Sequence, residues 1–296
     1  MKKLLPWLLS ASVLMPALPA SAGPVLDRIR QSGRIVLAHR DASVPLSYVD
    51  TQTHKPVGYA LDLCLKLADA VKRQLKLKQL DVSYLQVTPV DRVQAIATGK
   101  ADLECGATTN NAERRQQVAF TVPHYITGAR IMVRSDSKAE KITDFDHRKL
   151  AITKGTTVLK AVQRASQERM LNIQFIETPT HQAAIELLRK GEVDGFAMDD
   201  VQLYGLRAEA PDAEKFKVVG SFLTIEPLAI MLSKDDAEFK QLIDAEMVKL
   251  IQSREAYAIY DRWFMKPIPP RHVTLHMPMN YLLSDFWRYP SDAVPY

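Results

Sequence analysis

The chain has 296 residues, of which 39 are Lys or Arg and 34 are Asp or Glu, and its net charge at pH 7 is +5. Hydrophobic residues make up 47% of it, an ordinary value for a globular chain. Acidic residues stand between the basic ones throughout, which argues against a nucleic-acid footprint. The chain has 2 cysteines, which are too few for a metal-site framework. We expect neither a metal nor a cofactor.

The first residues have the pattern of an export signal. Lys2 and Lys3 form a basic start, residues 4–18 are apolar but interrupted by proline, and residues 20–22 read Ala-Ser-Ala. The alternative is a membrane anchor, for which this apolar stretch is short and broken. We predict that residues 1–22 are a cleaved signal peptide and that the mature protein is soluble.

Roughly 270 residues remain after cleavage, more than one compact core usually holds, so two domains are expected. In chain order the first unit is predicted to contain strands over 34–38, 82–87 and 101–105, a helix over 60–75, and a second helix from Thr88 to Gly99. Thr88-Pro89-Val90-Asp91 is typical of a helix start, with a capping hydroxyl, proline at the first helical position and an acid three residues after the cap.

The second unit repeats this alternation. It is predicted to contain strands over 150–153, 173–176 and 193–198, and helices over 157–168 and 182–189. The sequence Gly-x-x-Asp links helix to strand in both units, at Gly99 to Asp102 and at Gly191 to Asp194. Such alternation favours two mostly parallel sheets covered by helices, with a cleft between them at the carboxyl ends of the strands.

The remaining segments complete the predicted organisation. Apolar residues 129–133 and 228–232 are expected to cross between the two units, and residues 236–252 form an amphipathic helix followed by a shorter helix containing Trp263. From Lys266 onward, prolines exclude regular helix or central strand, which predicts an extended tail on the surface. The predicted domains are residues 23–128 with 229–265 as lobe 1, residues 129–228 as lobe 2, and residues 266–296 as the tail.

Cys64 and Cys105 lie in a predicted helix and a predicted strand. Export permits a disulfide, but the sequence gives no distance between the two residues. We expect two buried free thiols, with a bridge as the alternative.

Four blocks of residues resemble the glutamate/aspartate-binding proteins of bacterial ABC importers. These are His39 to Tyr48, Glu104-Cys105-Gly106-Ala107-Thr108-Thr109-Asn110-Asn111-Ala112-Glu113-Arg114, Met198-Asp199-Asp200, and Trp263-Phe264 with Pro267-Ile268-Pro269-Pro270. The resemblance implies an α/β, two-lobed periplasmic-binding-protein fold of type II, each lobe a mixed, mostly parallel sheet flanked by helices, with a two-segment hinge. It also implies a monomeric periplasmic receptor that closes over one amino acid, delivers it to a membrane permease, and is not an enzyme.

The resemblance assigns the ligand's α-carboxylate to Arg114 with Thr109 and, from the other lobe, Thr157. Bidentate arginine suits a carboxylate, and the free N–H groups at a helix start suit an anion. The alternatives are a solvated helix arginine for Arg114 and a plain helix N-cap for Thr157. Asp199 ends a predicted strand, where a carboxylate needs a cation, and it matches the family position that binds the ammonium. Asp200 is the less favoured partner, since it lies on the alternate face.

Arg40, Arg92 and His181 match family positions around the ligand's side-chain carboxylate, although a lone histidine at a helix start is more often structural. Three potential cations would repel one another unless an anion joined them, which favours glutamate or aspartate.

Two residues depart from the family pattern, Pro89 and Ala107, which each stand where the family usually has a serine. They leave open a ligand that is another dicarboxylate, or an amidated or modified acidic amino acid. A periplasmic dehydratase acting on prephenate-like compounds and a ligand-sensing module are the alternatives from other functional classes.

Overall fold

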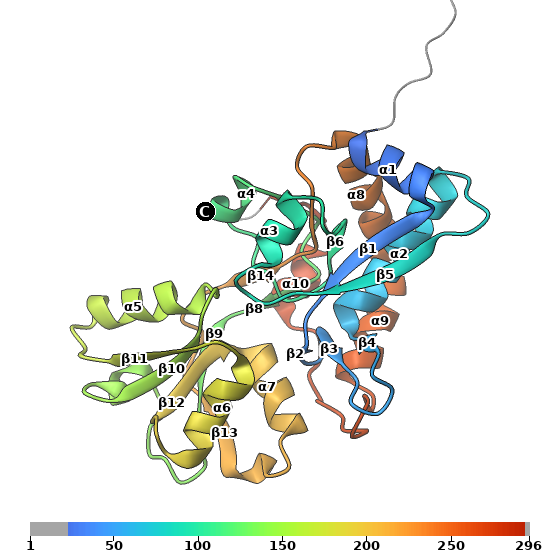
Figure 1. The fold of residues 1–296 in the computed structure, drawn as a ribbon. Helices are drawn as coiled ribbons and strands as arrows, with labels where there is room; N and C mark the ends of the chain where they lie inside the picture. Colours follow the sequence, from blue (N-terminus) through green and yellow to red (C-terminus); the bar gives the residue numbers. More distant parts are fainter. Residues whose placement is uncertain (1–22, 294–296) are drawn as a thin grey trace, which may run out of the picture.

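Two five-stranded sheets, each flanked by helices, form two lobes in a computed structural model that describes residues 23–293 (Figure 1). The predicted signal peptide, residues 1–22, lies outside the described residues. The first sheet has the strand order β5-β1-β6-β15-β7, and the second has the order β11-β10-β12-β9-β13. The predicted two-lobed α/β fold with mixed sheets is therefore confirmed. Within residues 23–293, no helix combines the length and the apolar character needed to cross a membrane.

The first sheet is built around the buried strand β1. Its strands are β1 (Arg34–His39), β5 (Asp81–Gln86), β6 (Leu103–Glu104), β7 (Ala119–Phe120) and β15 (Met231–Leu232). Strand β1 pairs in parallel with β5 and β6, and β15 pairs antiparallel with β6 and β7. The flanking helices are α1 (Pro24–Ser32), α2 (Tyr59–Gln74), α3 (Arg92–Ala97), α4 (Ala112–Arg115), α8 (Ala237–Gln252) and α9 (Glu255–Phe264). A small antiparallel sheet joins β2 (Ala42–Ser43), β3 (Ser47–Val49) and β4 (Pro56–Val57).

The second sheet likewise combines three parallel strands with two further strands that join by antiparallel pairing. Its strands are β9 (Ala129–Arg134), β10 (Lys149–Thr153), β11 (Gln174–Thr178), β12 (Gly195–Asp199) and β13 (Phe216–Val219). Strand β10 pairs in parallel with β11 and β12, while β9 pairs antiparallel with β12 and β13. Its helices are α5 (Val158–Glu168), α6 (His181–Lys190) and α7 (Asp200–Glu209), with short 3₁₀ turns η1 (Ile142–Phe145) and η2 (Ala213–Lys215).

The Gly-x-x-Asp repeat has the same conformation and the same type of hydrogen bond in both lobes. Gly191 directly follows α6 and Gly99 lies two residues after the end of α3, and both adopt left-handed conformations, with φ of 73° and 69°. Asp102 then accepts a hydrogen bond from the backbone N–H of Val36 at 2.7 Å, and Asp194 accepts one from Lys149 at 2.9 Å. Each aspartate therefore ties the start of the central strand of its sheet, β6 or β12, to the neighbouring parallel strand, β1 or β10.

The predicted start of the Thr88 helix is three residues too early. Residues 88–91 form a turn in which Asp91 Oδ1 accepts from the Thr88 N–H at 2.7 Å, and the helix itself begins at Arg92. Pro89 therefore occupies the turn and not the helix, although the reciprocal contact expected of a capping pair is formed.

The chain crosses between the sheets at a pair of short antiparallel strands, β8 (Tyr125–Thr127) and β14 (Glu226–Leu228). The segments expected to cross, 129–133 and 228–232, come slightly later along the chain. Residues 129–133 lie in β9, and residues 228–232 run from the end of β14 into β15. The apolar runs in those segments reflect burial within the two sheets.

The tail after Lys266 contains a helix, contrary to the prediction of a purely extended segment. Helix α10 (Tyr281–Phe286) lies beyond the proline-rich part, and its Leu283 is fully buried in the core of the first lobe together with Trp287. Trp287 Nε1 donates to the Pro123 carbonyl at 3.0 Å, and Asn280 Nδ2 donates to the Ile126 carbonyl of β8 at 2.7 Å. The tail thus packs against one of the two crossing strands.

Cys64 and Cys105 form a disulfide with a Cα–Cα distance of 6.1 Å, so the expectation of free thiols is wrong. Helix α2 and the residue after β6 meet in the core of the first lobe, which brings together two cysteines 41 residues apart in sequence. Both residues have no solvent exposure.

Reduction of this disulfide should lower the free energy of unfolding by about 2–4 kcal/mol, because the bridge restricts a loop of intermediate length in the unfolded chain. Urea unfolding with and without reductant measures the difference. The double variant Cys64→Ala/Cys105→Ala is the control and should not respond to reductant. Identical unfolding midpoints for the native chain in both conditions would contradict the prediction.

Candidate functional site

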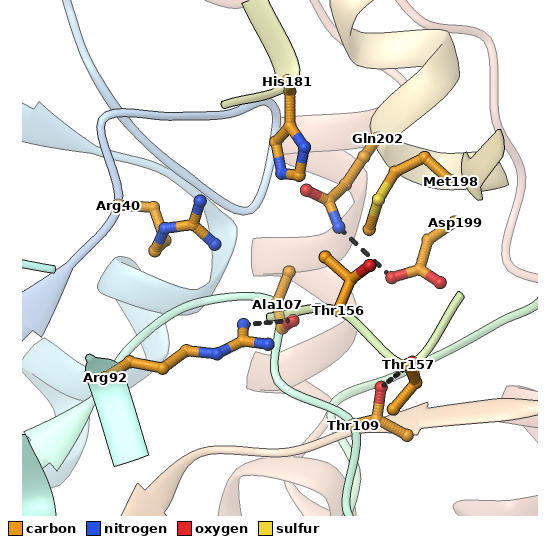
Figure 2. A pocket seen from close by; sticks show the side chains of 10 residues that line it. All are labelled: Arg40, Arg92, Ala107, Thr109, Thr156, Thr157, His181, Met198, Asp199 and Gln202. Carbon is orange, nitrogen blue, oxygen red and sulfur yellow. Dashed lines mark hydrogen bonds between the residues drawn. The ribbon is translucent and has the colours of Figure 1, made fainter. Parts of the chain in front are cut away.

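A pocket lies between the lobes, at the carboxyl ends of the parallel strands (Figure 2). The first lobe supplies residues that follow β1 and β6 and one that begins α3, namely Arg40, Arg92, Ala107 and Thr109. The second lobe supplies residues from the segments after β10 and β11, from the end of β12 and from α7, namely Thr156, Thr157, His181, Met198, Asp199 and Gln202. Segments far apart in the sequence therefore face one another in a single pocket.

The structure brings six of the seven predicted site residues into the lining of this pocket. These are Arg40, Arg92, Thr109, Thr157, His181 and Asp199. Arg114 does not line it directly but borders it, because its guanidinium donates to the Thr109 carbonyl at 2.9 Å and to the Gly155 carbonyl at 3.5 Å. Arg114 thus spans the cleft behind Thr109.

Gln202, Met198 and Thr156 were not identified from the sequence, although all three line the pocket. Gln202 carried a usable signal, since it stands three residues after Asp199 where a helix begins, and residues at that spacing share a helix face. Met198 and Thr156 are next to the predicted site residues Asp199 and Thr157, but no sequence pattern identifies them as site residues.

Two buried arginines form one end of the pocket. Arg40 Nε donates to the Val87 carbonyl at 3.1 Å, and Arg92 Nη1 donates to the Ala107 carbonyl at 2.8 Å. Burial, followed by repulsion from Arg92, lowers the pKa of Arg40 to about 10, and burial also lowers the pKa of Arg92. Both side chains remain cationic at neutral pH, and they attract an acceptor that enters the pocket.

Glu104 is a counter-charge that the sequence analysis did not include. It is fully buried, and its Oε2 accepts from the Thr108 hydroxyl at 2.8 Å. Its negative charge opposes the lowering of the pKa of both Arg40 and Arg92. Glu104 therefore offsets part of the effect of burial on the pKa of the two arginines.

His181 is neutral and does not act as a third cation. Burial, followed by repulsion from Arg40 and Arg92, lowers its pKa to about 3. Its Nδ1 lies 2.9 Å from the Thr153 hydroxyl, and a side-chain hydrogen bond with Gln202 opposes the lowering of its pKa. The pocket therefore contains two cations and not the three that the sequence suggested, because a histidine inside this cluster loses its charge.

Asp199 lies at the opposite end of the pocket from the two arginines. Its Oδ2 accepts from Gln202 Nε2 at 3.2 Å, and its buried Oδ1 has no partner in the described part of the chain. Burial, followed by repulsion from Glu226 and Asp200, raises the pKa of Asp199 to about 8. Asp200 instead accepts from the Thr127 hydroxyl at 2.6 Å, outside the pocket lining. A cationic group of a ligand would satisfy Asp199 Oδ1.

Two threonines meet across the cleft. Thr109 Oγ1 and Thr157 Oγ1 are 3.4 Å apart, and the Thr157 hydroxyl also donates to Glu226 Oε2 at 3.1 Å. Thr157 occupies the N-cap position of α5, but its side chain makes no capping hydrogen bond. The hydroxyl is thus turned toward the cleft, unlike that of a plain N-cap residue.

The two departures from the family pattern have different structural settings. Ala107 lines the pocket, and its carbonyl oxygen already accepts from Arg92. Pro89 is not among the lining residues and packs at the cleft rim against Gly155, where an added Cβ would lie 2.8 Å from the Pro89 carbonyl group. Within residues 23–293, no group of His, Cys, Asp and Glu side chains is arranged to hold a metal ion.

Two mixed α/β lobes with a charged pocket between them define a type II periplasmic binding protein. Solved structures agree in fold: ArgBP from T. maritima has a TM-score of 0.71 and 22% identity, covering 82% of this chain and 100% of that one. The cysteine-binding protein of Campylobacter jejuni has a TM-score of 0.69 and 24% identity, with coverage of 80% and 92%. The chain belongs to the bacterial extracellular solute-binding proteins of family 3, whose pattern matches residues 35–266.

Two curated relatives are similar over nearly their whole length. The L-glutamate/L-aspartate-binding protein of Pseudomonas aeruginosa is 35% identical over 285 residues, which cover 96% of this chain and 93% of that protein. The glutamate/aspartate import solute-binding protein of Escherichia coli is 33% identical over 276 residues, which cover 93% and 91%.

The raised pKa of Asp199 predicts a pH-dependent effect of Asp199→Asn on stability. A buried carboxyl that binds its proton more tightly in the folded state loses stability as the pH rises from its ordinary value of 3.8 to about 8. Urea unfolding of the ligand-free protein should show a gain for Asp199→Asn that is roughly 2–4 kcal/mol larger at about pH 8.5 than at about pH 5. The exposed Asp136→Asn is the control, and a gain that does not vary with pH would contradict the assignment.

Proposed function

We propose that this protein is a periplasmic receptor that captures an acidic amino acid, glutamate or aspartate, and delivers it to the permease of an ABC importer. The observation that carries the proposal is the separation of charge in the pocket, with Arg40 and Arg92 at one end and Asp199 at the other. The curated relatives named for glutamate and aspartate support the same ligand class.

The pocket offers a complementary group for each part of such a ligand. Asp199 Oδ1 accepts from the ammonium, and Thr109 and Thr157 hold the α-carboxylate with Arg114 behind them. The side-chain carboxylate lies toward Arg40 and Arg92, where buried cations make charge-assisted hydrogen bonds. His181 donates one neutral hydrogen bond to the same end. Every assigned group binds and none is required for a bond-breaking step, so we propose a receptor without catalytic activity.

Ligand binding is proposed to favour closure of the lobes, since each lobe supplies part of the pocket. Residues 23–128 with 229–265 move as one lobe, residues 129–228 as the other, and the protein acts as a monomer after loss of residues 1–22. Contacts between the lobes support this division: Lys160 Nζ lies 2.6 Å from Glu113 Oε2, and Arg114 reaches the Gly155 carbonyl.

Substitution of the two arginine positions should have different effects on ligand binding. Arg114→Ala should weaken binding of every amino acid by about 100-fold or more, because it leaves an α-carboxylate without its cation. Arg40→Ala should weaken glutamate and aspartate by a similar factor and affect neutral amino acids less. Calorimetric titration of ligand-stripped protein measures both effects.

Arg115→Ala provides a matched control, since Arg115 donates to Asn110 and to the tail residue Asp292 and does not line the pocket. Normal affinity in Arg114→Ala would contradict the ligand orientation. Failure of the unmodified protein to bind glutamate and aspartate would contradict the proposed function itself.

Gly205 tests whether closure contributes to affinity. It lies on α7 of the second lobe, and an added Cβ would overlap the carbonyl oxygen of Val44 in the first lobe. Gly205→Ala should therefore weaken glutamate binding by about tenfold, because the closed arrangement becomes less favourable. The free energy of unfolding should not fall, since alanine favours a helix interior over glycine. Unchanged affinity in this variant would show that closure does not require the α7 contact with Val44.

A further inference from the structure

Glu226 is a buried carboxylate that has no part in the proposed binding mode. It begins β14, one of the two crossing strands, and is 5% exposed. Its Oε2 accepts from the Thr157 hydroxyl at 3.1 Å. Burial, followed by repulsion from Arg92, lowers the pKa of Arg114 to about 10, and the negative charge of Glu226 opposes this lowering. Glu226 therefore acts on two of the three residues to which the proposed function assigns the ligand's α-carboxylate.

The hydrogen bonds of the two cleft threonines run in one direction, toward Glu226. An ionised carboxylate only accepts, so the Thr157 hydroxyl is the donor to Glu226. A hydroxyl has a single proton, so in the 3.4 Å pair between the threonines Thr109 donates and Thr157 accepts (Figure 2). Both protons are thus directed along one chain of side chains, from Thr109 in the first lobe through Thr157 in the second lobe to Glu226 on β14.

An α-carboxylate bound at this place needs the same proton. For Thr157 to donate to the ligand, its hydroxyl must turn away from Glu226, whose Oε2 then loses that donor. The loss of a hydrogen bond to one buried carboxylate offsets the gain of a similar bond to another. The ligand also brings a second negative charge close to Glu226, and like charges repel more strongly in a buried site than in water. Thr157 therefore contributes little net free energy to binding while Glu226 lies beside it.

We propose that Glu226 competes with the ligand's α-carboxylate for the Thr157 proton and thereby weakens the binding of amino-acid ligands. This inference rests on the proposed function, since it uses the same placement of the α-carboxylate. It makes Glu226 an affinity-limiting residue on a crossing strand, outside the residues that line the pocket. A receptor that must pass its ligand to a permease benefits from such a limit, because differences in affinity are mostly differences in the rate of release.

Calorimetric titration of ligand-stripped protein with glutamate and aspartate tests the inference through a cycle of substitutions. Glu226→Gln keeps the shape of the side chain, removes its charge and adds an N–H that can donate to Thr157. It should bind both ligands at least about tenfold more tightly than the unmodified protein. Thr157→Val removes the hydroxyl with little change of shape. It should change affinity by less than about threefold when Glu226 is present, and should weaken binding by about tenfold or more in the Glu226→Gln background.

The exposed Glu192→Gln in the second lobe is the matched control and should change no affinity, and thermal unfolding of each variant verifies that it is folded. Unchanged or weaker binding in Glu226→Gln would overturn the inference, and weaker binding would mean that Glu226 helps to hold the ligand. An equal effect of Thr157→Val in both backgrounds would also overturn it, because the two carboxylates would then not share the Thr157 proton.

The single variant Thr157→Val keeps the inference testable even if Glu226→Gln does not fold, since a loss of about tenfold in Thr157→Val would contradict the competition. Failure of the unmodified protein to bind glutamate and aspartate would contradict the proposed function instead.

Discussion

The site depends on the burial of basic and acidic side chains at the meeting point of two sheets. Arg40, Arg92 and Asp199 are all nearly inaccessible to water, and burial is the largest influence on the pKa of each. Charges in this environment are costly unless partners surround them. Binding of a zwitterionic ligand can therefore recover free energy that the empty pocket lacks, and this recovery requires both lobes because the cations and Asp199 come from different sheets.

Electrostatic coupling assigns the roles within the pocket. Burial, together with repulsion from the two arginines, keeps His181 neutral where a cation was expected. Glu104 opposes the lowering of the pKa of the same two arginines. Gln202 links this half of the pocket to Asp199, because its carboxamide donates to that carboxylate and turns its oxygen toward His181. Neutral polar groups therefore line the pocket together with the ionisable ones.

Two features outside the pocket, the disulfide and the C-terminal tail, stabilise the first lobe. In the first lobe a disulfide joins α2 to the residue after β6, the strand that leads into the Ala107–Thr109 segment. The C-terminal tail packs on the same lobe and hydrogen-bonds to β8, one of the two crossing strands, through Asn280. Both connections stabilise the lobe that carries Arg40 and Arg92, while the crossing strands remain the covalent links to the other lobe.

The sequence by itself determined the two α/β units, their helix ends at Gly99 and Gly191, and six of the residues that meet in the pocket. Those features follow from local periodicity, turn chemistry and short motifs. Only the tertiary structure decided the disulfide, the α10 helix in the core, the neutral state of His181, the counter-charge on Glu104 and the place of Gln202. Each of these depends on desolvation or on contact between segments distant in sequence, and neither quantity is encoded in a local pattern.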